Sequence, residues 1–291
     1  MKIANYLVKS FFSILIITSL SAVIYAQETS AVIEDIIVTA EKRTESLQDL
    51  SQAVTVLNSD DLDKKQISTF VDISAIAPGV NVAKNEGFKT VITIRGVGYE
   101  TNQNAIATPS VSYHLDGIYI ASPYSLQTEF MDLERIEVLR GPQGTLFGQN
   151  STGGAINVIT AAPSLEESSS YGDITVGDYS LIKTRASFNR PLSETVAVRA
   201  SFITHKRDGF TDNLSTGQDL DDADSISARI RFLYQPSDTF RANFTAQIFD
   251  ENRNGSAQKG LLDTITDPRK LRQNSQTEHK LEASLYSAVL E

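Results

Sequence analysis

Residues 135–148 read RIEVLRGPQGTLFG, and residues 153–157 read GGAIN a few positions later. The apolar run at 136–139 predicts a strand that ends in a glycine-rich turn, and residues 155–160 predict a second strand. The glycines are superficially similar to a phosphate-binding loop, but the Lys-Ser/Thr pair of a P-loop is missing and no parallel βαβ pattern surrounds them. We therefore interpret these glycines as tight turns that allow close backbone packing.

The surrounding residues 51–163 mix short strands, short helices and glycine turns. Ser59 precedes Asp60 and Asp61 and is predicted to cap a helix, and a second helix is predicted over 69–76, before Pro78-Gly79. Strands are predicted over residues 54–57, 91–95, 111–120, 136–139 and 155–160. Residues 51–163 are therefore predicted to form a compact α+β domain of about 110 residues.

From Ser168 onward apolar and polar residues alternate strictly. In residues 182–189 one face carries Ile182, Thr184, Ala186 and Phe188, and the other carries Lys183, Arg185, Ser187 and Asn189. The same period recurs in residues 196–202, 226–234, 240–248 and 281–289, and the apolar set of the last segment is Leu281, Ala283, Leu285 and Val289. A period of two over segments of this length predicts half-buried strands.

The connections between these strands alternate in length. Short turns at 190–194 and 235–238 alternate with long polar loops at 207–224 and 252–278. Such asymmetry, with strands of about 10 residues, is typical of an outer-membrane β-barrel, and a soluble β-sandwich is the alternative. In a barrel the apolar face meets lipid, and the opposite face, which carries Arg199, Arg229 and Arg231, meets a wet lumen because lipid-facing arginine is costly near mid-membrane.

The N-terminus and the composition restrict the class of protein. Residues 1–26 combine Lys2 and Lys9 with an apolar run and a small-residue end, which predicts a cleaved signal peptide. The net charge of −10 argues against a nucleic-acid partner, and the absence of cysteine excludes disulfides and thiolate metal sites. The three histidines lie in unrelated segments without a nucleophile elbow, so no enzyme, cofactor or metal site is predicted.

Three stretches together resemble the TonB-dependent outer-membrane receptors, the ligand-gated active importers of Gram-negative bacteria. Residues 34–40 (EDIIVTA) are similar to the TonB box, residues 91–97 (VITIRGV) to the first plug signature, and residues 135–157 to the second. The resemblance implies an α+β plug inside an antiparallel transmembrane β-barrel of about 22 strands. Six strands are predicted here, so we expect an N-terminal piece of a longer receptor.

The resemblance also implies an organisation and a set of partners. The chain divides into a signal peptide (1–26), a flexible lead with the TonB box (27–50), a plug domain (51–163) and the N-terminal part of the barrel (168–291). The box consists of Glu34, Asp35, Ile36, Ile37, Val38, Thr39 and Ala40. Its β-prone triplet suits strand addition to the energy-transducing protein TonB, which acts with the inner-membrane ExbB-ExbD complex, and the alternative is a first strand packed on the plug.

Further residues receive roles from the same resemblance. Arg95 and Arg140 each precede a glycine and are expected to latch the plug to barrel glutamates in further strands, and the alternative is bonding to local carbonyls. Plug loops facing outward are expected to bind the ligand through Phe88, Glu100, Gln103 and Tyr124. The aspartates of 219–224 suit either a hard cation or, by default, a solvated loop.

Two functions follow from these expectations. The first is import of a scarce nutrient, such as a ferric siderophore, cobalamin or an oligosaccharide, across the outer membrane and its lipid. The second is a truncated, non-transporting product whose plug acts only as a periplasmic binding module. The sequence does not distinguish among the three ligand classes.

Overall fold

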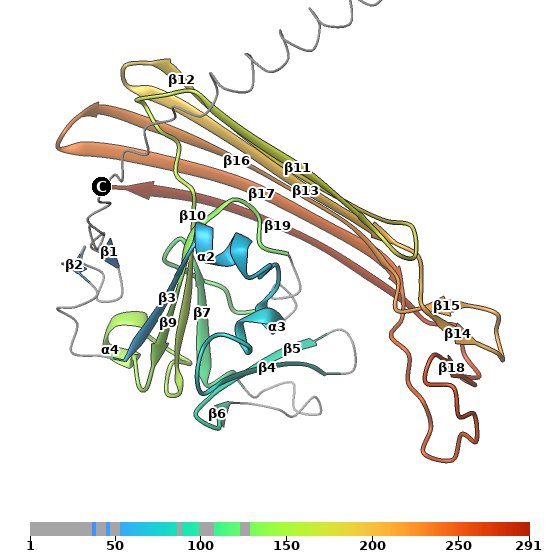
Figure 1. Cartoon of the computed structure of the whole chain (residues 1–291). Coiled ribbons are helices and arrows are strands. Elements are labelled where there is room, and N and C mark those ends of the chain that lie inside the picture. Colours follow the sequence, from blue (N-terminus) through green and yellow to red (C-terminus); the bar gives the residue numbers. More distant parts are fainter. Residues whose placement is uncertain (1–36, 39–44, 47–52, 86–88, 99–107, 123–128) are drawn as a thin grey trace, which may run out of the picture. The chain divides into compact units, whose positions relative to one another are not determined.

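The computed structural model describes residues 37–38, 45–46, 53–85, 89–98, 108–122 and 129–291 (Figure 1). The predicted signal peptide lies outside these residues. Within the described ranges, no helix has both the length and the apolar character needed to cross a membrane.

In the described residues, the plug contains two sheets and three short helices. The five-stranded sheet has the order β3 (Val54–Asn58), β9 (Leu133–Arg140), β10 (Gly154–Thr160), β7 (Val111–Leu115) and β8 (Ile118–Tyr119), and only its β10–β7 pair is parallel. The second sheet contains β4 (Val80–Asn85), β5 (Lys89–Ile94) and β6 (Val97–Gly98). The helices are α2 (Ser59–Lys64), α3 (Phe70–Ile73) and α4 (Gly144–Phe147). The predicted α+β class is confirmed.

The plug has its own apolar core. Phe70 of α3 is buried and meets the rings of Tyr113 and Phe130 edge-on, with centroids 4.9 and 4.8 Å apart. The strands add further buried side chains, among them Ile94, Ile136, Val138, Ile156 and Val158. Gly154 shows why glycine is needed in the second signature: φ is +149°, and a Cβ there would lie 2.3 Å from the Leu139 carbonyl oxygen. The interpretation of close backbone packing is thus confirmed at this position.

Two local predictions were wrong. Asn58, not Ser59, caps α2, because its backbone is extended and its Oδ1 accepts the Asp61 N–H at 2.7 Å. Residues 111–120 form a hairpin, β7 and β8, rather than one strand. Asp116 and Gly117 have φ of 50° and 78°, so this Asp-Gly pair turns the chain back on itself.

The second half of the chain forms a six-stranded antiparallel sheet. Its order is β11 (Ser169–Gly177), β12 (Leu181–Ser193), β13 (Val196–Arg207), β16 (Ala223–Ser237), β17 (Phe240–Asn254) and β19 (Glu278–Leu290) (Figure 1). Ile182, Ile230 and Ile248 are more than half exposed on one face, whereas Ser201, Ser227 and Arg229 are buried on the other. The predicted alternation is confirmed for β12, β13, β16 and β17.

Strand β19 departs from the prediction, since its apolar set does not lie on the exposed face. Ala283 pairs with Phe249, and Leu285 pairs with Gln247, both on the side where Arg229 is buried. Residues directly opposite in a ladder share a face, so Leu281, Ala283, Leu285 and Val289 belong to the inner face. The outer face of β19 carries Glu282, Ser284, Tyr286 and Leu290, all exposed.

The two long loops are partly folded. They contribute β14 (Thr211–Asn213), β15 (Asp219–Leu220) and β18 (Lys270–Leu271) to one small sheet, in which Leu220 and Leu271 are buried. The Asp221 carboxylate accepts hydrogen bonds from Thr211 Oγ1 and the Ala257 N–H, at 2.7 and 3.0 Å. This aspartate therefore connects the two loops.

Candidate functional site

The plug and the long strands meet through polar contacts on the inner face of the sheet. Asp132, just before β9, accepts both Nε and Nη2 of Arg199 at 2.6 Å, and Ser201 Oγ donates to the same carboxylate. Arg199 and Ser201 are alternate residues of β13 and so share its inner face. A two-pronged arginine–carboxylate contact fixes orientation as well as distance.

Two arginines of β16 hold the plug backbone beside this contact. Arg229 and Arg231 pair in register with Ser201 and Arg199. Arg229 donates to the Met131 carbonyl, and Arg231 Nη1 donates to the carbonyl and Oγ1 of Thr160 at 2.9 and 2.6 Å. The three arginines, Ser201, Asp132, Met131 and Thr160 are called the anchor here.

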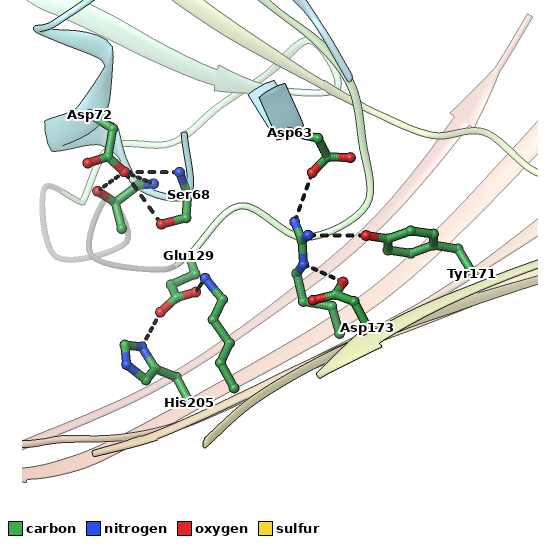
Figure 2. A network of polar contacts seen from close by, with 10 residues as sticks. Asp63, Ser68, Asp72, Glu129, Tyr171, Asp173 and His205 are labelled. Atoms are coloured by element: carbon green, nitrogen blue, oxygen red, sulfur yellow. Dashed lines mark hydrogen bonds and ion pairs between the residues drawn. The ribbon is translucent and has the colours of Figure 1, made fainter. Parts of the chain in front are cut away.

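A second cluster lies closer to the long-loop ends of the strands. The Glu129 carboxylate contacts His205 Nδ1 with one oxygen and Lys183 Nζ with the other (Figure 2). Lys183 and His205 are paired residues of β12 and β13. Glu129 directly follows the segment 123–128, so it links the start of this described stretch of the plug to two strands of the sheet.

A third cluster joins helix α2 to the edge of the sheet. The Arg185 guanidinium donates to Asp173 at 2.8 Å, to Tyr171 at 3.1 Å and to Asp63 of α2 at 3.1 Å (Figure 2). Asp63 is exposed, so this contact is worth less than the anchor.

The contacts with the sheet favour the ionised forms of two plug carboxylates, Glu129 and Asp132. Burial by itself raises the pKa of Asp132, but the hydrogen bonds from Arg199 and Ser201 outweigh burial and hold that pKa below its usual range. For Glu129 burial likewise acts upward, and the contacts with His205 and Lys183 bring its pKa below the ordinary value. Both carboxylates are therefore negative at neutral pH and attract the basic inner face.

Two cavities lie between the plug and the other strands of the sheet. The first, about 340 Å³, has a largely apolar and aromatic lining that includes Tyr113, Phe130, Phe249, Ala283 and Leu285. The second, about 630 Å³, has a polar lining that includes Asp116, Arg135, Arg231, Arg241 and Glu291. Both cavities are bordered by β17 and β19.

The predicted latch arginines lie at strand ends of the plug. Arg140 donates to Thr55 Oγ1 at 2.9 Å and to the Pro78 carbonyl at 3.3 Å, both within the plug. Arg95 is exposed, with φ of 52°, and its N–H donates to the Gly79 carbonyl at 2.7 Å. The Arg140 side-chain contacts are of the local kind, the Arg95 bond involves only its backbone, and a latch to glutamates of further strands stays a prediction.

Most of the other predicted site residues lie outside the residues that the structure describes. Phe88, Glu100, Gln103 and Tyr124 lie outside the described residues. Of the TonB box, the described part is β1 (Ile37–Val38), which pairs antiparallel with β2 (Glu45–Ser46). Glu34, Asp35, Ile36, Thr39 and Ala40 lie outside the description.

The sequence analysis missed the plug side of the anchor. It placed Arg199, Arg229 and Arg231 on the inner face but named no partner for them. The signal was present, because Glu129 and Asp132 stand immediately before the second plug signature and three arginines that face the lumen require acceptors. Their pairing depends on which strand faces which plug segment, and alternation alone does not give that.

An α+β plug bonded to the polar face of long antiparallel strands whose other face is apolar defines a plugged outer-membrane barrel. The family model described as TonB-dependent Receptor Plug Domain matches residues 46–155. The pesticin receptor of Yersinia pestis is 30% identical over 209 residues, which make up 69% of this chain and 29% of that receptor. A vitamin B12 transporter of Vibrio vulnificus is 25% identical over 270 residues, or 89% of this chain and 40% of the transporter.

Solved structures show the same fold. The ferric yersiniabactin uptake receptor of Yersinia pestis superimposes with a TM-score of 0.69 at 24% identity, covering 82% of this chain and 38% of that one. The ferripyoverdine receptor of Pseudomonas aeruginosa gives 0.69 at 17% identity, covering 88% and 34%. The chain thus spans well under half the length of the relatives it matches. It belongs to the TonB-dependent outer-membrane receptors, a family of transporters and receptors, and corresponds to their N-terminal part.

Proposed function

We propose that the receptor containing this chain imports a ferric chelate across the outer membrane, with energy delivered through TonB. The observation that carries the proposal is the anchor, in which Asp132 and the Thr160 backbone bind the arginines of β13 and β16. A plug fixed to the inner wall closes a lumen, and a closed lumen needs work to open. Import through such a receptor therefore requires both a ligand and an energy source.

The names of the relatives support the class of ligand. Those matched over much of this chain include a ferric yersiniabactin uptake receptor, a ferripyoverdine receptor and an iron-regulated outer membrane virulence protein. The vitamin B12 transporter supports cobalamin as the second candidate. Iron recurs more often in these names, so a ferric chelate is the first ligand to test.

Residues 34–40 support coupling to TonB. Ile37 and Val38 adopt extended backbone and pair with a short strand, which is the conformation that strand addition to a partner requires. We propose that this segment exchanges its present pairing for an edge of TonB. ExbB-ExbD would then supply the energy from the inner membrane.

The test uses the full-length receptor in Gram-negative cells that lack other ferric yersiniabactin receptors. Wild type is expected to take up ⁵⁵Fe-yersiniabactin, and deletion of TonB should abolish uptake while surface binding persists. Val38→Pro, which removes a backbone donor and fixes φ, should act like the TonB deletion. Val38→Ala is the matched control, since it keeps the N–H and should retain most uptake.

The possible outcomes separate the parts of the proposal. Uptake of cyanocobalamin but not the ferric chelate would replace the ligand class and leave import standing. Full uptake by Val38→Pro would contradict the role of residues 34–40. Uptake that is unaffected by loss of TonB would contradict energy coupling itself.

A further inference from the structure

The inner face of the sheet has two different parts. The plug contacts described above fall on β12, β13 and β16, through Lys183, Arg185, Arg199, Ser201, His205, Arg229 and Arg231. The two cavities lie against β17 and β19 instead. Within the described residues, the plug contacts named above therefore fall on one part of the wall, and the two cavities border the other part.

The two cavities are arranged in series along the strands. Gln247 and Leu285 line the apolar cavity, and Asn243 and Val289 line the polar one. Between them on the inner face lies a single cross-strand row, Arg231, Thr245 and Ser287, which are paired in register. Alternate residues of a strand are roughly 7 Å apart, so one row of side chains, two of them small hydroxyls, separates the cavities.

On the plug side, one hairpin lines both cavities. Tyr113, Leu115 and Tyr119 of β7 and β8 face the apolar cavity, and Asp116 and Gly117 of the turn face the polar one. Strand β8 is the edge of the plug sheet and pairs only through His114–Tyr119 and Leu115–Ile118. Strand β7, by contrast, lies between β10 and β8 and pairs with β10 from Val111 to Leu115, so moving β8 disturbs less of the plug sheet than moving β7.

The hairpin is held by its turn. The Asp116 carboxylate accepts the Thr160 N–H and the Thr160 hydroxyl, each at 2.8 Å, and lies 3.9 Å from Arg231 Nη1. Because Thr160 also accepts from Arg231, the turn, strand β10 and the wall meet at one point. That point stands at the row between the cavities.

We propose that the imported ligand crosses the plug along β17 and β19, where displacement of strand β8, which lines both cavities through Tyr119 and Ile118, joins them into one passage. The anchor on β13 and β16 stays closed during this step. The proposal rests on import as the function of the receptor, and it adds the side of the plug on which the ligand passes. It assigns Ser287 and Thr245 to the narrowest part of that passage.

The residues that line the two cavities also indicate the chemistry of the ligand. Aromatic and aliphatic side chains dominate the apolar cavity, with the Arg229 guanidinium at its border. The polar cavity is lined by Arg135, Arg231 and Arg241, together with acidic residues such as Asp116 and Glu134. A ligand that combines an aromatic body with acceptor oxygens matches this order of surfaces.

The test places one thiol at the row between the cavities. The 291 residues contain no cysteine, so Ser287→Cys introduces a single reactive group into this part of the receptor. Ala288→Cys is the matched control, since it is the next residue of β19 and is exposed on the outer face. Both variants are expressed as full-length receptor and treated with N-benzylmaleimide in intact cells, with and without TonB, during uptake of ⁵⁵Fe-yersiniabactin.

The proposal predicts that the thiol of the Ser287→Cys receptor reacts at least fivefold faster when ligand and TonB are both present. After modification, uptake through this variant should fall at least tenfold while surface binding changes less than twofold. The Ala288→Cys receptor should keep its uptake whether or not it is modified. Because the benzyl group is added after folding, loss of uptake in this design does not arise from misfolding.

Two results would contradict the proposed passage along β17 and β19. One is a Ser287→Cys thiol whose reaction rate does not depend on ligand and TonB, and the other is a modified Ser287→Cys receptor that imports normally. Failure of unmodified wild type to import the ferric chelate is a separate result, which concerns the proposed ligand. The same variants are then run with cyanocobalamin, so the two failures remain distinguishable.

Discussion

Two parts of the sheet differ in how they contact the plug. One part consists of β12, β13 and β16, and the other consists of β17 and β19. The first presents Lys183, Arg199, Arg229 and Arg231 to plug carboxylates and carbonyls. The second presents Phe249, Ala283 and Leu285 to a cavity. Among the described residues, directional contacts join the plug to the first wall, and cavities with room for movement border the second.

The two parts of the wall therefore contact the plug through different kinds of side chain. Arginines that are taken out of water need charged or carbonyl acceptors, so each one on β13 and β16 fixes a plug segment in place. Apolar side chains make no such demand on orientation, and an apolar cavity has few contacts to break when its walls separate. Three experiments test this contrast, in order of expected effect.

Removal of Asp132 should have the largest effect. Asp132→Ala leaves Arg199 half-buried without its carboxylate, and loss of one partner of such a pair costs about 3 kcal/mol of stability. The measurement is urea unfolding of the purified full-length receptor in detergent, together with protease sensitivity of the plug. Asp238→Ala, in an exposed turn, is the control and should change stability little. Equal stability of the two variants would contradict the anchor.

Replacing an inner-face alanine by leucine should have the second largest effect, and the change in stability should differ between the two walls. Ala197 on β13 is fully buried, so Ala197→Leu overpacks its site and should cost about 2 kcal/mol. Ala283 on β19 lines the apolar cavity, where the same change to leucine fills open volume and should cost nothing or stabilise by about 1 kcal/mol. Both values come from the same unfolding assay. A larger cost at Ala283 than at Ala197 would refute the contrast in packing.

Acid should weaken the bonded wall by a smaller amount. Contacts in the folded state lower the pKa of Glu129 and of Asp132, so their stabilisation is present above the unfolded carboxyl pKa and is lost as pH falls. The loss of stability begins at about pH 4 and continues through the lowered pKa of each group. Unfolding between pH 7 and pH 3 should show it, and the double variant Glu129→Gln, Asp132→Asn should have a flatter profile. The stability of the Ala283→Leu control should depend on pH as that of wild type does. If the double variant is as acid-sensitive as wild type, these carboxylates are not the cause of the loss.

Much of the fold could be predicted because it is encoded locally. Period-two alternation specified β12 to β17, and the glycine-rich second signature specified the turn and the packing around Gly154. The boundary inside residues 111–120 was missed, although Asp116-Gly117 is a hairpin signal in its own right. For β19, an apolar set was assigned to the lipid face because the other strands follow that rule, and register with β17 decided otherwise.

By itself, then, the sequence determined the elements, the family and the basic character of the inner face, since propensity, alternation and glycine turns are properties of neighbouring residues. Only the tertiary structure decided that Asp132 and Glu129 meet that face, that β19 turns Leu281 and Leu285 inward, and that two cavities lie in series beside it. These features join residues that are distant in the chain, such as Asp132 and Arg199, which are 67 positions apart. Their pairing depends on strand register and on how the plug packs, which no local pattern encodes.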